Sequence, residues 1–170
     1  MNKLFLILFI ISTIVYSYDT LTVVKVKDGD TYLLSNGKIV RLIGIDTPEK
    51  FKSVKLKKDV KKYNINTNIM KSMGELSSIY AQKNIEGKRV ALYYGRDTID
   101  YYGRTLAYIY IIGDSISFNA RIIKDGYSKT FRKYSFNQKK SFIEYQLKAE
   151  KENKGLWKTH KKYMKSFCFD

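Results

Sequence analysis

The stretch DGDTYLLSNGKIVRLIGIDTPE, residues 28–49, constrains the fold of this chain more than any other segment. Asp28-Gly29 and Asn36-Gly37 are dipeptides that suit tight hairpin turns, and strand-like apolar runs flank both of them. We therefore expect three short strands joined as a β-meander.

Several polar residues of the same stretch are not explained by hairpin turns. Asp30 follows the first turn, Arg41 lies on the third expected strand, and Asp46-Thr47-Pro48-Glu49 contains the only proline of the chain. If Asp30, Asp46 and Glu49 gathered at one end of a barrel, they would repel one another and raise one another's pKa. A bound divalent metal is the simplest source of a neutralising charge.

The pattern along the whole chain predicts five strands and three helices. Runs rich in β-branched and aliphatic residues predict strands at about 21–26, 31–34, 39–45, 90–94 and 106–112. Apolar spacing predicts helices at about 74–85, 118–124 and 137–153. This order suits an α+β fold, a five-stranded Greek-key β-barrel of the OB type with three attached helices. We expect one domain at 20–157 and a basic tail at 158–170.

Three motifs together resemble the staphylococcal nuclease family. They are D-G-D-T at 28–31, R-x-x-x-x-D-T-P-E at 41–49 and D-Y-Y-G-R-x-L-A-Y-I-Y at 100–110. Each motif is weak alone, but three of them in the right order and at fitting intervals make a strong signal. The resemblance runs from about Val23 to Trp157, and the family has the OB-type barrel expected above.

The resemblance implies a calcium site. The matching positions of the family bind Ca²⁺, which assigns this role to Asp30, Asp46 and Thr47. Two carboxylates and the backbone carbonyl of Thr47 are hard oxygen ligands, and water can complete the flexible shell that calcium accepts.

The resemblance also assigns the catalytic groups. The glutamate that matches Glu49 is read as the general base, and Arg41 and Arg104 would clamp the phosphate. A guanidinium suits that role because it gives two parallel donors to phosphate oxygens. Tyr102 and Tyr134 are expected to contact the substrate, Tyr102 by a hydrogen bond to phosphate or by stacking on a base.

Two departures from the family concern the nucleotide rather than the reacting phosphorus. Tyr101 stands where the family commonly has a lysine, and Arg132 stands where it often has a tyrosine. They bear on substrate preference and affinity, and leave the reaction type unchanged.

The charge of the chain agrees with a polyanionic partner. The formal net charge is +16 and the pI is about 9.7, which attracts nucleic acid or another acidic polymer by field alone. The resemblance implies a nuclease that hydrolyses DNA and RNA without sugar specificity and leaves 3′-phosphate ends, and a monomer is the default expectation. The alternative is a non-catalytic OB-type module that binds nucleic acid or another polyanion.

The N-terminus predicts export. Lys3 precedes an apolar run from Leu4 to Tyr16, which is too short for a typical membrane span and suits a signal peptide at 1–17. A retained N-terminal anchor is the competing interpretation, and only then is a membrane a partner. We expect the mature chain to be secreted or extracytoplasmic. His160 and Cys168, both in the tail, are given no catalytic role.

Residues 50–73 are the part least like the family. Seven lysines between 50 and 62 are opposed by one acid, Asp59, and a charge run of this kind predicts a solvated loop. The functional alternative is a flexible basic flap that gathers phosphates beside the site.

Overall fold

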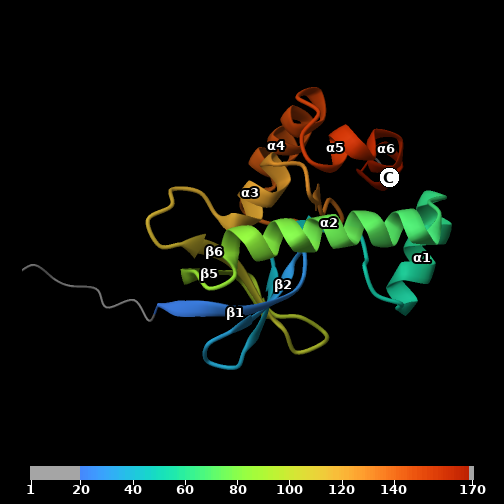
Figure 1. Cartoon of the computed structure of the whole chain (residues 1–170). Coiled ribbons are helices and arrows are strands. Elements are labelled where there is room, and N and C mark those ends of the chain that lie inside the picture. Colours follow the sequence, from blue (N-terminus) through green and yellow to red (C-terminus); the bar gives the residue numbers. More distant parts are fainter. Residues whose placement is uncertain (1–19, 169–170) are drawn as a thin grey trace, which may run out of the picture.

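The structure, a computed structural model, describes residues 20–168. The predicted signal peptide at 1–17 lies outside the described residues. A β-barrel forms one layer of the domain and most of the helices form the other, with one long helix, α2 (Thr67–Ile85), running between them (Figure 1).

Five strands close into a barrel in the order β1-β2-β3-β6-β5. Their bounds are β1 Leu21–Asp28, β2 Thr31–Leu34, β3 Ile39–Leu42, β5 Arg89–Ile99 and β6 Thr105–Ile111. Neighbouring strands pair antiparallel except β3 and β6, which pair in parallel and complete the closure. The expected five-stranded OB-type barrel is confirmed.

The third expected strand, 39–45, is divided in two. β3 ends at Leu42, the chain turns at Gly44 with a φ of 77°, and a two-residue strand β4 (Ile45–Asp46) pairs with β7 (Lys129–Thr130). A Cβ at Gly44 would lie 2.4 Å from the ring of Phe136, so glycine is needed here for space as well as for φ. The turn carries Asp46 out of the barrel wall.

Six helices occur in the described part of the chain. The three expected ones are present as the second half of α2, α3 (Phe118–Lys124) and α4 (Lys139–Lys151), and the structure adds α1 (Val54–Tyr63), α5 (Leu156–Thr159) and α6 (Lys161–Cys168). Within residues 20–168, none of the helices is long and apolar enough to cross a membrane.

The solvated loop expected at 50–73 is wrong, because this segment forms α1 and the start of α2. Ser53 caps α1 by accepting a hydrogen bond from the backbone N–H of Leu56, and Asn64 ends the helix in the left-handed conformation with a φ of 51°. Leu56 and Tyr63 are buried on the inner face of α1. The lysines of α1 outnumber its apolar residues, but none of them is among the residues buried on the inner face.

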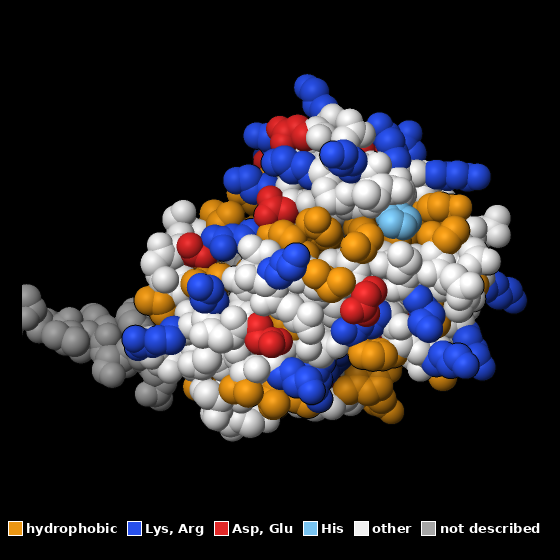
Figure 2. All heavy atoms as spheres, in the orientation of Figure 1, with side chains coloured by type: hydrophobic (Ala, Val, Ile, Leu, Met, Phe, Trp, Pro, Cys, Tyr) orange, Lys and Arg blue, Asp and Glu red, His pale blue; other side chains and the backbone are white. Residues whose placement is uncertain are grey.

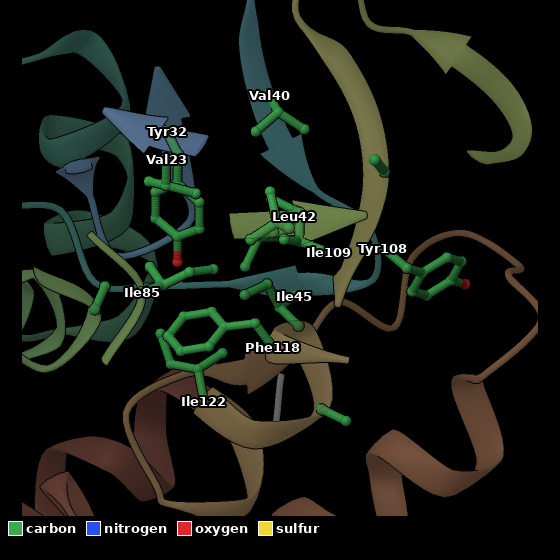
Figure 3. Packing of buried hydrophobic residues seen from close by; sticks show 14 of the residues in the cluster. Val23, Tyr32, Val40, Leu42, Ile45, Ile85, Tyr108, Ile109, Phe118 and Ile122 are labelled. Carbon is green, nitrogen blue, oxygen red and sulfur yellow. The ribbon is translucent and has the colours of Figure 1, made fainter. Parts of the chain in front are cut away.

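Two hydrophobic clusters hold the layers together. The first fills the barrel and the space under the helices, where Tyr32, Leu42, Ile109 and Phe118 meet (Figure 3). The second lies among α1, α2, α5 and α6 and consists of large side chains, including Met70, Met73, Trp157, Met164 and Phe167. The residues expected to form a basic tail are therefore helical, and several are buried.

We expect Phe167→Ala to destabilise the domain by about 3–5 kcal/mol, because it removes a fully buried ring from the second cluster. Urea unfolding of the variant measures this loss. Lys165→Ala, at an exposed position of the same helix, should change the free energy of unfolding by less than about 0.5 kcal/mol. Equal stability of the two variants would show that α6 does not contribute to the fold.

Candidate active site

Arg41 joins two buried carboxylates at one end of the barrel. Its Nη1 donates a hydrogen bond to Asp30 Oδ1 at 2.6 Å, and its Nη2 donates to Asp46 Oδ1 at 3.2 Å. Asp30 directly precedes β2 and Asp46 lies on β4, so the turn at Gly44 is what returns Asp46 to the arginine. The structure thus brings together three of the residues predicted from sequence.

The turn before Asp30 is fixed by its own side chain and by a close approach. Asp28 Oδ1 accepts a hydrogen bond from the backbone N–H of Asp30, which is a typical Asx-turn. Gly29 does not have the positive φ expected of it; instead, a Cβ there would lie 2.7 Å from Thr47 Cγ2 and 3.0 Å from Ser77 Cβ. Glycine is therefore needed here because the turn packs against Thr47 and α2.

Thr47 is tied directly to Asp30. Its backbone N–H and its Oγ1–H both donate to Asp30 Oδ2, at 3.2 and 3.1 Å. The three predicted metal-binding residues, Asp30, Asp46 and Thr47, are thereby adjacent in space.

Helix α2 supports the backbone that carries Glu49. A Cβ at Gly74 would lie 2.6 Å from the Pro48 carbonyl oxygen and from the Glu49 carbonyl carbon, so the helix touches this segment backbone to backbone. The Glu49 carboxylate accepts from Lys55 Nζ at 2.6 Å and from Ser53 Oγ at 3.4 Å. Both donors come from the start of α1.

Arg104 reaches the same end of the barrel from the β5–β6 turn. Its Nε donates to Asp100 Oδ2 at 2.8 Å, and its Nη1 lies 3.5 Å from Thr31 Oγ1. The Thr31 hydroxyl donates to Asp30 Oδ1, the oxygen that Arg41 also contacts. Arg41 therefore contacts Asp30 directly, and Arg104 is linked to the same carboxylate through the Thr31 hydroxyl.

The two predicted substrate-binding tyrosines differ in their placement. Tyr102 is 78% exposed and lies over the Arg104 guanidinium, with 5.4 Å between ring centroid and Cζ. Tyr134 is also exposed, but its ring contacts are with Phe131 and Lys133 rather than with the carboxylate cluster. The structure brings Tyr102 to the site and does not bring Tyr134 into the cluster.

Three charged residues that the motifs did not identify complete the cluster. Lys55 Nζ lies 3.0 Å from Asp46 Oδ1 and 3.6 Å from Asp59 Oδ2, in addition to its bond to Glu49. Lys129, on β7, lies 3.7 Å from Asp46 Oδ2 and donates to Tyr63 Oη and to the Phe167 carbonyl. The i,i+4 spacing of Lys55 and Asp59 was the one sequence signal for this arrangement.

Mutual pairing sets the ionisation of these groups. Burial alone would raise the pKa of Asp30, but the charges of Arg41 and Lys55 outweigh it and lower that pKa. Burial would lower the pKa of Lys55, but Asp46 and Glu49 outweigh it and raise the pKa. Burial, with the neighbouring Asp30, raises the pKa of Asp28 to about 7. Asp30 and Lys55 are therefore charged at neutral pH, whereas Asp28 is partly protonated.

The donor set fits a hard divalent cation. In residues 20–168 no three His, Cys, Asp or Glu side chains gather as a metal-binding group, so side chains alone would not complete a coordination shell. Asp30 and Asp46 place two carboxylates on one guanidinium, and Thr47, the third predicted ligand, is hydrogen-bonded to Asp30. Calcium accepts such a mixture of carboxylate, carbonyl and water oxygens.

Basic side chains outnumber acidic ones on the molecular surface. Figure 2 shows lysines and arginines spread over the barrel and the helices on one face, with fewer acidic side chains between them. Such a surface attracts a polyanion.

Comparison with known proteins agrees with this geometry. The model of the staphylococcal nuclease homologue family matches residues 39–159, a range that holds every predicted site residue except Asp30, which precedes it. Thermonuclease of Staphylococcus intermedius is 34% identical over 138 residues, covering 78% of this chain and 73% of that protein. An uncharacterised endonuclease of Haemophilus influenzae is 31% identical over 161 residues, covering 92% and 76%. An uncharacterised protein of Methanocaldococcus jannaschii is 34% identical over 148 residues, covering 79% and 70%.

We expect Gly74→Ala to destabilise the domain, although this change in an unstrained helix interior normally stabilises by about 0.5–1 kcal/mol. The added Cβ would meet the backbone of Pro48 and Glu49. Thermal unfolding and the activity of the variant measure the two effects. Ser72→Ala, at an exposed position of α2, is the control. A stabilised Gly74→Ala variant would show that α2 does not hold this segment.

The pKa of Asp28 gives a pH-dependent prediction. It is about 7 in the folded chain against an ordinary value of 3.8, so between these pH values the folded chain holds a proton that the unfolded chain has released. The ionisation of Asp28 therefore lowers the free energy of unfolding progressively as pH rises from about 4 to 7, and the full loss is reached above pH 7. In chelator, Asp28→Asn should raise the melting temperature more at about pH 8 than at about pH 5. The exposed Asp97→Asn should show no such difference; an equal effect at both pH values for Asp28→Asn would contradict the assignment.

Proposed function

Since this chain belongs to the staphylococcal nuclease family and is a nuclease that hydrolyses phosphodiester bonds, we propose that it is a secreted, calcium-dependent endonuclease that cleaves both DNA and RNA. The observation that carries the proposal is that Arg41 bridges Asp30 and Asp46 at one end of the barrel. Arg104 reaches the same place through the Thr31 hydroxyl, and Lys55 joins Glu49 to Asp46.

Phosphodiester hydrolysis needs a polarised phosphoryl oxygen, a base that aims water, and cations that stabilise the added negative charge. Calcium held by Asp30, Asp46 and Thr47 would supply polarisation and positive charge. Every other requirement falls to side chains of this chain.

Glu49 is the base in this proposal. Its carboxylate accepts a proton from the attacking water, and Ser53 and Lys55 at the start of α1 lie against it in this structure. The close backbone contact with α2 holds the chain segment that carries Glu49 in place.

Arg41 and Arg104 hold the phosphate. Arg104 uses Nε and Nη2 on Asp100, which directs Nη1 toward Thr31 and the cluster. Arg41 donates one hydrogen bond to each of two carboxylates. A guanidinium has five N–H donors, so others remain for the phosphate. Two guanidiniums on one phosphate would stabilise the charge that develops during attack.

Substrate choice in this proposal rests on backbone contacts. A net charge of +16 and phosphate-binding arginines give affinity without sequence information, so binding should weaken strongly with salt. Tyr102 supplies a stacking surface that any base can use, worth roughly 1–3 kcal/mol. The family resemblance supports cleavage that leaves 3′-phosphate ends, and the apolar run from Leu4 to Tyr16 supports export.

The test is digestion of single-stranded DNA, double-stranded DNA and RNA by the purified protein, with Ca²⁺ and with chelator. Arg104→Ala should lower kcat roughly 10²- to 10³-fold, as loss of one preorganised donor does. Glu49→Gln should also lower kcat while leaving substrate binding intact. Arg89→Ala and Glu144→Gln, at exposed positions, are the matched controls.

Fragments should accept polymerase extension only after a phosphatase has removed their 3′-phosphate. Salt-dependent binding without cleavage, under any divalent ion, would instead identify a polyanion-binding module and contradict the proposed function.

A further inference from the structure

The donors on the two metal-binding carboxylates leave little room for a metal. Asp30 Oδ1 accepts from Arg41 and Thr31, and Asp30 Oδ2 accepts from Thr47. Asp46 Oδ1 lies within 3.2 Å of both Arg41 and Lys55, and its Oδ2 faces Lys129. A divalent cation must therefore displace at least one of these positive groups from Asp46.

Exposure distinguishes the three cations that could leave. The Lys55 side chain is 41% exposed, against 17% for Arg41 and 8% for Lys129. Arg41 is shared by two carboxylates, and Lys129 is enclosed by the rings of Tyr63 and Phe167 at 4.3 and 4.0 Å. Lys55 carries its charge on a flexible four-carbon stem, so it can move at the lowest cost.

An alternative partner for Lys55 lies one helical turn away on α1. Asp59 Oδ2 is buried, receives no hydrogen bond from residues 20–168, and is 3.6 Å from Lys55 Nζ. Residues at i and i+4 share one helix face, so a side-chain rotation can exchange Asp46 for Asp59 while α1 stays in place.

We propose that Lys55 is a built-in competitor of the metal, whose ammonium neutralises Asp46 and Glu49 in the metal-free protein and moves to Asp59 when a divalent cation binds. The inference rests on the proposed calcium site and adds two residues to it. Lys55 keeps the empty carboxylate cluster stable, and Asp59 makes its departure possible. Two residues of α1 then set the affinity for metal, although α1 lies outside the three sequence motifs of the site.

The test is calorimetric titration of Ca²⁺ into wild-type protein and variants. Lys55→Met should lower the Kd for Ca²⁺ by roughly 5- to 150-fold, the usual range of a coupling between sites. Lys58→Met removes the same charge from an exposed position of α1 and should change the Kd far less. In chelator, Lys55→Met should also lower the melting temperature, because Asp46 and Glu49 lose a neutralising partner.

Asp59→Asn provides a variant of opposite sign. It should raise the Kd for Ca²⁺, because the displaced ammonium has lost its second partner, and this effect should vanish in the Lys55→Met background. Equal Kd values for Lys55→Met, Lys58→Met and wild type would overturn the inference, while calcium-dependent cleavage would still support the proposed function. If only Lys55→Met bound Ca²⁺ measurably, the result would support the inference, because it would show that the Lys55 ammonium excludes the cation from the wild-type site. Absence of binding by every variant would overturn the inference together with the calcium site.

Discussion

The pairing of Arg41 with Asp30 and Asp46 is the interaction on which this end of the molecule depends. Both carboxylates are almost fully buried, and a buried carboxylate without a partner is strongly destabilising. One guanidinium satisfies both and so fixes the start of β2, the end of β3 and the short strand β4 relative to one another. The same contact places the two acids side by side, where the proposed calcium site lies, so one arrangement serves both the fold and the proposed site.

Local sequence patterns predict the barrel strands, but they do not predict the break after Leu42 or helix α1. The Asn36-Gly37 turn and the apolar strands were readable because each depends on residues close in sequence, and Gly37 has the expected positive φ of 79°. The break after Leu42 depends on Phe136, a distant residue that occupies the space beside Gly44. Helix α1 was missed because its lysines concealed the spacing of Leu56 and Tyr63, although Ser53 was a recognisable cap.

The candidate site divides in the same way. Asp30, Arg41, Asp46 and Glu49 belong to contiguous motifs, so the resemblance identified them and the fold brings them together. Lys129 reaches Asp46 only through the pairing of β4 with β7, and Lys55 reaches it only because α1 is a helix. Neither contact has a signature within a short window of sequence. Tyr134, which the resemblance assigned to substrate binding, has its ring contacts with Phe131 and Lys133 instead.

The parallel pairing of β3 with β6 has a kinetic consequence. Val40 pairs with Thr105, and this contact closes the barrel across a long intervening segment that includes α1 and α2. Bringing such distant strands together costs loop entropy before any contact rewards it, which slows folding of proteins with this topology. Arg104 follows β5 and precedes β6, so it reaches Thr31, which is next to Asp30, only when this pairing forms. A nascent or partly folded chain therefore has no working constellation, and catalytic competence is gained only on barrel closure.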